Sequence, residues 1–203
     1  MPYKRYRPAS THGNDPVPVF RVIDSKPQPL HQQPRQYAKS QQLFQQLAAS
    51  PDPDAVAMTA IGPGDAGTVV HLAKLWSELV YEQVRAARFP EMVSRLDCVF
   101  GFTDIVEAFA FVGVGSGTRV FRGTTASGIP WSVTDMSKYH SAQISPGQTF
   151  SSIRPTVEAQ AAAYWSADRP ISRADVLVGG AIDLEVQIDL VDLYEAMGLV
   201  DSG

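Results

Sequence analysis

An amphipathic segment from Thr68 to Arg88, followed closely by Pro90, constrains the fold of this chain more than any other part of its sequence. Apolar side chains recur in this segment at steps of three and four residues: Leu72, Leu75, Trp76, Leu79 and Val80. That spacing places them on one face of an α-helix, so we expect a long helix whose apolar face is buried. Pro90 lacks a backbone N–H and stops the helix. A polar Ser-Arg pair then opens an apolar run, which predicts a buried strand from Ser94 to Phe102.

Shorter patterns predict the remaining elements. We expect further strands over residues 17–23, 118–124 and 175–190, and helices over residues 40–49, 104–111, 155–165 and 192–197. Pro18 predicts that the first strand starts late or lies at a sheet edge. The section from Thr125 to Arg154 has no clear periodicity and is expected to be irregular. Because strands and helices do not alternate strictly, the order favours an α+β fold over a doubly wound parallel sheet.

Length and composition limit the classes of protein that this chain can represent. Its 203 residues, 44% of them hydrophobic, suffice for one sizeable core, so we expect a flexible arm over residues 1–16 and a single monomeric domain over residues 17–203. A formal net charge of −4 argues against nucleic acid as a partner. No apolar run approaches the roughly 20 residues that span a bilayer, so no membrane partner is expected. Cys98, the single cysteine, is expected to be a small buried hydrophobe.

The motif Gly62-Pro63-Gly64-Asp65-Ala66-Gly67 matches the spacing of a dinucleotide-binding loop and directly precedes the long helix. With a strand over residues 55–61, it would hold a pyrophosphate at a helix N-terminus, as in a Rossmann-type NAD oxidoreductase. Pro63 removes one backbone donor from such a loop, and no acidic residue ends a second strand about 20 residues later. The sequence therefore leaves two interpretations, a dinucleotide site and an ordinary turn before a helix.

Two arginines lie inside apolar strands, Arg21 in Phe-Arg-Val-Ile and Arg122 in Val-Phe-Arg-Gly. A guanidinium buried beside a sheet costs free energy unless it is paired. An ion pair with Asp or Glu meets this need, and so does an anionic ligand held by two hydrogen bonds. Both interpretations remain open for each arginine. The four histidines form no H-x-x-x-H pair, so we expect no metal site.

Three short motifs occur in order along the chain: Phe20-Arg21-Val22, the run from Ser94 to Phe100, and Ala163-Tyr164-Trp165-Ser166 followed by Asp175 to Gly180. Together they resemble the motifs of the ADP-ribosyltransferase superfamily, in particular its bacterial toxin- and effector-like members. In that family an Arg on the first strand touches NAD, a polar strand lies under the nicotinamide, and an acidic residue precedes a late strand. The resemblance implies an α+β fold with a split two-sheet core and flanking helices, forming one catalytic domain.

The resemblance also implies roles for individual residues. Arg21 would bind NAD, and Ser94 would hold Arg21 and shape the pocket. Asp175 would be the catalytic acid, with Glu185 as the alternative acid. The nicotinamide would stack on an aromatic wall that includes Trp131, Tyr139 or Tyr164. A carboxylate near the ribose hydroxyls would stabilise the positive charge that develops as the nicotinamide–ribose bond breaks.

A second alignment of the motifs uses Arg122, then Phe150-Ser151-Ser152, then Asp175, and resembles the order in vertebrate-type enzymes. In that alignment Arg122 and Ser151 would line the NAD site. Only one helix is expected between Ser151 and Asp175, where the family has a further strand. We therefore prefer the alignment on Arg21.

The resemblance implies a mono-ADP-ribosyltransferase, a glycosyltransferase that moves ADP-ribose from NAD, its substrate, to a protein acceptor. The family's range suggests a bacterial effector or toxin with a role in virulence, acting on a host protein such as ubiquitin or a small GTPase. Since the basic N-terminal residues have no apolar stretch after them, we expect secretion or translocation by a non-Sec route, and otherwise a cytoplasmic protein. The alternatives are a catalytically inactive binding module of the same fold and the Rossmann-type oxidoreductase.

Overall fold

A computed structural model describes residues 10–23, 30–60, 66–112, 119–168, 171 and 173–197. The strands are β1 (His12–Gly13), β2 (Pro18–Ile23), β3 (His31–Gln32), β4 (Val99–Phe102), β5 (Arg119–Thr124), β6 (Trp131–Asp135), β7 (Ala174–Val178) and β8 (Ile182–Ile188). The helices are α1 (Tyr37–Ser40), α2 (Gln42–Ala49), α3 (Pro53–Ala60), α4 (Ala66–Arg88), α5 (Ile105–Val112), α6 (Phe150–Ser166) and α7 (Leu190–Ala196), with a 3₁₀ turn, η1 (Met136–Lys138). The expected α+β class is confirmed.

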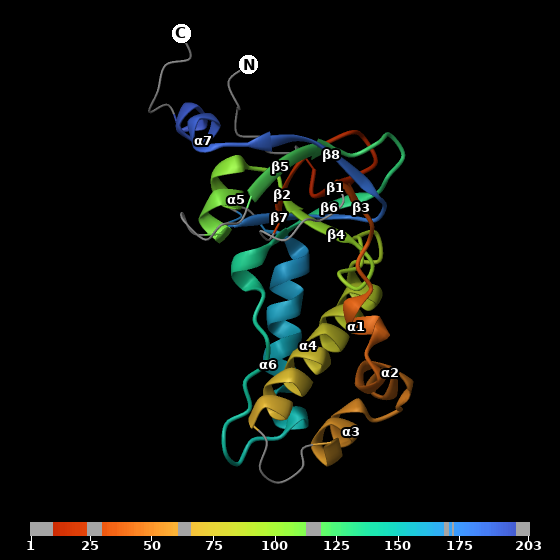
Figure 1. Cartoon of the computed structure of the whole chain (residues 1–203). Helices are drawn as coiled ribbons and strands as arrows, with labels where there is room; N and C mark the ends of the chain where they lie inside the picture. Colours follow the sequence, from red (N-terminus) through yellow and green to blue (C-terminus); the bar gives the residue numbers. More distant parts are fainter. Residues whose placement is uncertain are drawn as a thin grey trace.

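The strands form one eight-stranded sheet in the order β1-β6-β7-β4-β2-β5-β8-β3, and every pairing between them is antiparallel. Helices α4 and α6 run side by side away from one face of this sheet, and α1, α2 and α3 pack along α4 (Figure 1). Helix α5 packs against the central strands β2 and β4, and α7 packs against α5 (Figure 1). The largest apolar core fills the space between α2, α4, α6 and the sheet, so the interface between sheet and helices can bury polar groups deeply.

The sheet consists of two four-stranded halves that are barely connected. Strands β2 and β5 share six register pairs, from Pro18 opposite Thr124 to Ile23 opposite Arg119, whereas β2 and β4 are joined at one, Phe20 opposite Phe102. The expected split two-sheet core is therefore replaced by one sheet with a narrow junction. Pro18 was expected to make this strand start late or lie at an edge; β2 starts late, at Pro18 rather than Val17, and is not an edge strand.

Gly101 allows the two halves to approach each other at this junction. A Cβ atom on Gly101 would overlap Cγ1 of Val19 and lie 3.1 Å from the carbonyl oxygen of Phe20. We therefore expect Gly101→Ala to lower the free energy of unfolding by about 1–3 kcal/mol, since overpacking in a close-packed core forces side chains off their preferred rotamers. Urea denaturation measures this loss. Gly128 has a φ of +84°, and nothing lies within 4 Å of its Cβ position. Gly128→Ala therefore measures the cost of a positive φ without any steric overlap. An unchanged midpoint for Gly101→Ala would contradict the close approach.

Several elements differ from the sequence-based expectations. Strand β6 lies inside the section expected to be irregular, because its polar residues Ser132 and Thr134 are buried and hide the strand pattern. The strand expected from Ser94 begins only at Val99. Part of the arm expected before Val17 pairs as β1 with β6, and residues 1–9 lie outside the described residues. The strand that a Rossmann motif needs over residues 55–61 is instead helix α3, and residues 61–65 of the glycine-rich loop lie outside the described residues.

Candidate functional site

Arg95 is the centre of a buried charged cluster at the interface between the sheet and α4. Its side chain is 7% exposed, and it belongs to the irregular segment that leads from α4 into β4. Nε and Nη2 donate hydrogen bonds of 3.2 Å to the two carboxylate oxygens of Glu78 on α4. Three aromatic rings surround the guanidinium carbon, at 3.9 Å for Tyr139, 4.8 Å for Phe100 and 5.1 Å for Tyr164, measured to the ring centroids. Planar contacts of this kind hold an arginine in one orientation.

Asp175 lies on the sheet side of the cluster, with its side chain 3% exposed. The register of β6 and β7 places Thr134 directly opposite it, and the Thr134 hydroxyl donates a hydrogen bond to Oδ1. Oδ2 accepts a hydrogen bond of 3.2 Å from the Tyr164 hydroxyl on α6 and lies 4.0 Å from Nη1 of Arg95. The same Nη1 donates a 2.8 Å bond to the Tyr164 oxygen. Strand pairing and helix packing thus both fix this carboxylate.

Two carboxylates in this cluster share one guanidinium. Burial raises the pKa of Asp175 above its ordinary value, although Arg95, Thr134 and Tyr164 all favour the charged form. Burial also opposes the charge of Glu78, but the charge and hydrogen bonds of Arg95, together with the Tyr139 hydroxyl bond of 2.6 Å, outweigh burial and lower the pKa of Glu78. The cluster therefore carries one negative charge in excess when both acids are ionised. Groups whose pKa values are pushed apart in this way are typical of sites that exchange protons or stabilise charge.

Arg21 lies beside this cluster, at the junction of the sheet halves. Its neighbour Phe20 is opposite Phe102, which is itself opposite Asp175, so Phe20 shares a transverse row with Asp175 and Arg21 lies one residue beyond that row on β2. Two strand spacings separate their strands, about 10 Å. The Arg21 guanidinium donates a hydrogen bond to the carbonyl of Phe100, whose ring contacts Arg95. Arg21 and Asp175, the two residues of the preferred alignment, thus lie on strands that are separated by β4.

The other predicted site residues lie elsewhere. Ser94 donates a 2.8 Å hydrogen bond to Glu82 and accepts one from the Leu96 amide, so its described contacts anchor the segment before β4 to α4. Trp131 is buried in the apolar core on the other face of the sheet, and its indole N–H donates to the carbonyl of Asp15. The expectation that Trp131 forms a nicotinamide wall finds no support in this position.

The second alignment does not form a single site. Arg122 is exposed on β5, and Ser151 is exposed at the start of α6, the end that packs against α3 far from the sheet (Figure 1). Glu185 is also exposed, on β8, with three strands between β8 and β7. Neither Arg122 nor Glu185 therefore belongs to the charged cluster, whereas Asp175 does.

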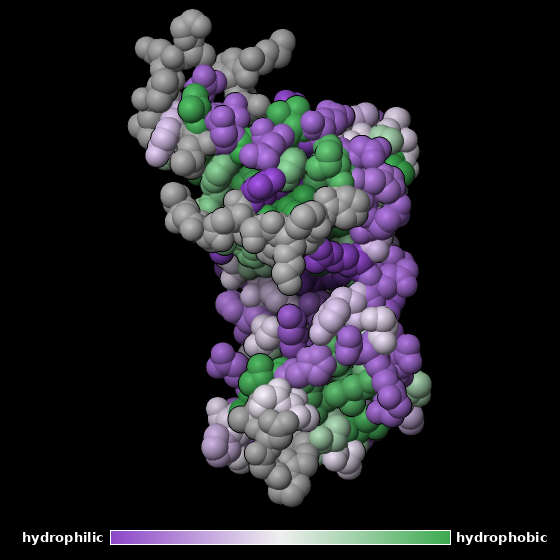
Figure 2. All heavy atoms as spheres, viewed as in Figure 1, coloured by the Kyte–Doolittle hydropathy of each residue, from purple (hydrophilic) through white to green (hydrophobic). Residues whose placement is uncertain are grey.

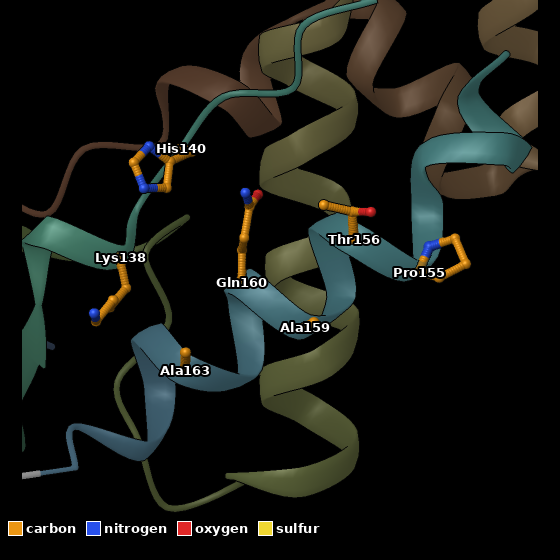
Figure 3. Close-up of a pocket in the computed structure, with 7 residues that line it drawn as sticks. All are labelled: Lys138, His140, Pro155, Thr156, Ala159, Gln160 and Ala163. Carbon is orange, nitrogen blue, oxygen red and sulfur yellow. The ribbon is translucent and has the colours of Figure 1, made fainter. Parts of the chain in front are cut away.

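A surface groove lies next to the cluster. It has a volume of about 590 Å³ and is bounded by Lys138 and His140 on one side and by α6 on the other (Figure 3). Gln160 projects from α6 into it, and the small side chains of Ala159 and Ala163 form its floor (Figure 3). Tyr139 lies between Lys138 and His140 in the sequence, and its ring packs on the guanidinium of Arg95. This ring separates the groove from the charged cluster. Hydrophilic side chains gather on the surface between the sheet and the far ends of the helices, where the molecule is narrowest in this view (Figure 2).

Sequence reasoning missed Glu78 and Thr134 and underestimated Arg95, which was not assigned a role. The one available signal for Arg95 was the polar Ser-Arg pair in front of an apolar strand. Glu78 is flanked along its helix by apolar residues on the buried face, and nothing local distinguishes it from a solvated glutamate. Within the described residues no group of three His, Cys, Asp or Glu side chains could hold a metal ion.

Comparison of the sequence with protein-family models and with curated proteins finds no match. The function must therefore be argued from the cluster and the junction themselves. In the described part of the chain, no helix has both the length and the apolar character needed to cross a membrane.

Proposed function

We propose that the chain is a mono-ADP-ribosyltransferase that binds NAD at the junction of the sheet halves and transfers ADP-ribose to a protein. The single observation that carries this proposal is the buried cluster itself, in which two carboxylates, those of Glu78 and Asp175, share the one guanidinium of Arg95. A fixed, desolvated carboxylate stabilises positive charge far better than the same group in water does. Cleavage of the nicotinamide–ribose bond develops such a charge on the ribose.

The proposal assigns two roles. Asp175 stabilises the developing oxocarbenium ion, and Arg21 binds the pyrophosphate or the adjacent ribose. Arginine suits the second role because its planar fork binds phosphate oxygens with charge-assisted hydrogen bonds. Arg21 lies at the narrow junction, where β2 and β4 share one register pair and the Arg21 guanidinium donates to the Phe100 carbonyl. Binding at the junction would orient the glycosidic bond toward Asp175.

The proposal is tested by incubating labelled NAD with the protein and a cell lysate. Label on a lysate protein supports transfer. Consumption of NAD without labelling indicates a glycohydrolase instead, and absence of both binding and consumption contradicts the proposal.

Arg21→Ala is expected to raise the KM for NAD about 10- to 100-fold, since a charge-assisted hydrogen bond contributes about 1.5–3 kcal/mol. Arg122→Ala is the matched comparison, because it removes an exposed arginine from the neighbouring strand β5. We expect its KM to stay within twofold of the wild-type value. Steady-state kinetics at several NAD concentrations measure both constants, and circular dichroism checks that both variants fold. A raised KM in Arg122→Ala, together with an unchanged KM in Arg21→Ala, would favour the alignment on Arg122.

A second candidate function is a binding module that retains the fold without transfer. The burial of Asp175 favours it, because a carboxylate whose side chain is 3% exposed presents little surface to a substrate. Isothermal titration with NAD separates the two candidates when combined with the labelling assay. Binding without NAD consumption supports the module, whereas binding with labelling supports the transferase.

A further inference from the structure

A directional chain of hydrogen bonds connects α4 to the carboxylate on β7. The Tyr139 hydroxyl donates to Glu78 at 2.6 Å, and Arg95 donates to both oxygens of Glu78. Arg95 also donates to the hydroxyl oxygen of Tyr164 at 2.8 Å, and Tyr164 donates to Asp175 at 3.2 Å. Because the Tyr164 oxygen accepts from Arg95, its own proton is free to point at Asp175.

Glu78 determines where the Arg95 fork points. The carboxylate binds Nε and Nη2, which leaves Nη1 to face Tyr164 and Asp175. The aromatic rings around the guanidinium prevent it from turning to another partner without breaking these contacts. Among the contacts of the described residues, none joins Glu78 directly to Asp175, so the influence of Glu78 passes through Arg95.

A purely structural role explains this arrangement poorly. Removing charged groups from water costs several kcal/mol for each ion, and well-packed apolar residues often stabilise such a site as well or better. The second carboxylate adds a further cost here, because one guanidinium serves both acids. An arrangement of this kind is expected where the orientation of one member matters for chemistry.

We propose that Glu78 is a positioning residue that orients the Asp175 carboxylate through Arg95 and Tyr164. This inference rests on the proposed function, in which Asp175 faces the reacting ribose. The groups that surround Asp175 come from four elements and the segment before β4: Thr134 on β6, Tyr164 on α6, Arg95 and Cys98 before β4, Phe102 on β4, and Glu78 on α4 behind Arg95.

The test uses Glu78→Gln, which keeps the shape of the side chain but removes its charge and one acceptor for Arg95. We expect the carboxyl titration midpoint of Asp175 to move down by about one pH unit, since a like charge is removed and Arg95 then serves a single carboxylate. Carbon-13 NMR of protein labelled at the aspartate carboxyl carbons measures this midpoint, and the Asp175→Asn spectrum assigns the signal. We also expect kcat to fall about tenfold while the KM for NAD stays within twofold.

Two further variants separate positioning from structure. Tyr139→Phe removes the hydroxyl that binds Glu78 and should shift the midpoint in the same direction by a smaller amount. Glu158→Gln removes a glutamate that pairs with Arg154 on α6, at 3.4 Å and half exposed, and should leave both the midpoint and kcat unchanged.

The outcomes distinguish this inference from the proposed function. A wild-type protein that transfers no ADP-ribose, but whose Asp175 midpoint moves in Glu78→Gln, overturns the function and retains the positioning of Asp175. A folded Glu78→Gln variant with the wild-type midpoint and wild-type kcat overturns the positioning. Loss of thermal stability without any change in the midpoint likewise shows that Glu78 is structural, and overturns the inference.

Discussion

Asp175→Asn is expected to lower kcat for ADP-ribose transfer by about 100-fold or more, because removing one preorganised electrostatic group from a buried site typically costs 10²–10³ in rate. Asparagine has nearly the same shape, and its one carbonyl oxygen can still accept from either Thr134 or Tyr164, which donate to separate oxygens of Asp175. The variant therefore removes the negative charge and leaves the packing in place. The expected loss is in kcat, with the KM for NAD changed little, because the charge on the ribose develops in the transition state.

Glu185→Gln is the matched control for this loss. Glu185 is the other acid that the sequence offers for the role, and it is exposed on β8. We expect its kcat to remain within twofold of the wild-type value in the same labelling assay. Full activity in Asp175→Asn, or loss of activity only in Glu185→Gln, would contradict the assignment of the catalytic acid to Asp175.

Asp175→Asn is also expected to change how the stability of the protein depends on pH. Because burial raises the pKa of Asp175 in the folded state, the folded protein binds its proton more tightly than the unfolded chain does. The contribution of Asp175 to stability is thus most favourable at low pH and is lost as the pH rises from its ordinary value of 3.8 through the raised value. Asp175→Asn lacks this term, so its stability should fall less over that interval in urea denaturation at a series of pH values.

Arg95→Met is expected to lower the free energy of unfolding by about 3–5 kcal/mol, since removing one partner of a buried ion pair leaves the other charge uncompensated. The effect should be at the upper end of this range at neutral pH, because Glu78 and Asp175 both lose their cation. Methionine fills much of the volume of the arginine stem, so the loss reports mainly on charge and hydrogen bonds. Urea denaturation followed by tryptophan fluorescence measures it.

An exposed ion pair provides the control for Arg95→Met. Lys39 lies 3.4 Å from Asp97, with side chains 41% and 43% exposed, and Lys39→Met should cost about 0–1 kcal/mol because solvent screens such pairs. Adding Glu78→Gln to Arg95→Met should recover part of the lost stability, since it removes one of the two uncompensated charges. A cost for Arg95→Met that is no larger than that for Lys39→Met would show that the cluster does not hold the sheet and helices together.

The local pattern of the sequence was sufficient for most elements of the fold. The periodic apolar residues between Thr68 and Arg88 predicted α4, because an amphipathic helix is defined by spacing along one segment. Strand β6 was not predicted, because its buried Ser132 and Thr134 look like the polar residues of a loop until their partners are known. Alternation reveals a strand only where one face is apolar.

The sequence by itself determined that this chain forms an α+β domain, that Arg21 and Asp175 lie on strands, and that a Ser-Arg pair precedes β4. The tertiary structure decided which of these residues meet. Arg95 is 17 positions from Glu78 and 69 from Tyr164, and Thr134 is 41 positions from Asp175. Contacts at such separations depend on the strand order β6-β7-β4-β2 and on the packing of α4 and α6 against the sheet. No local period encodes that order, since loop closure and core packing select it only when the whole chain folds.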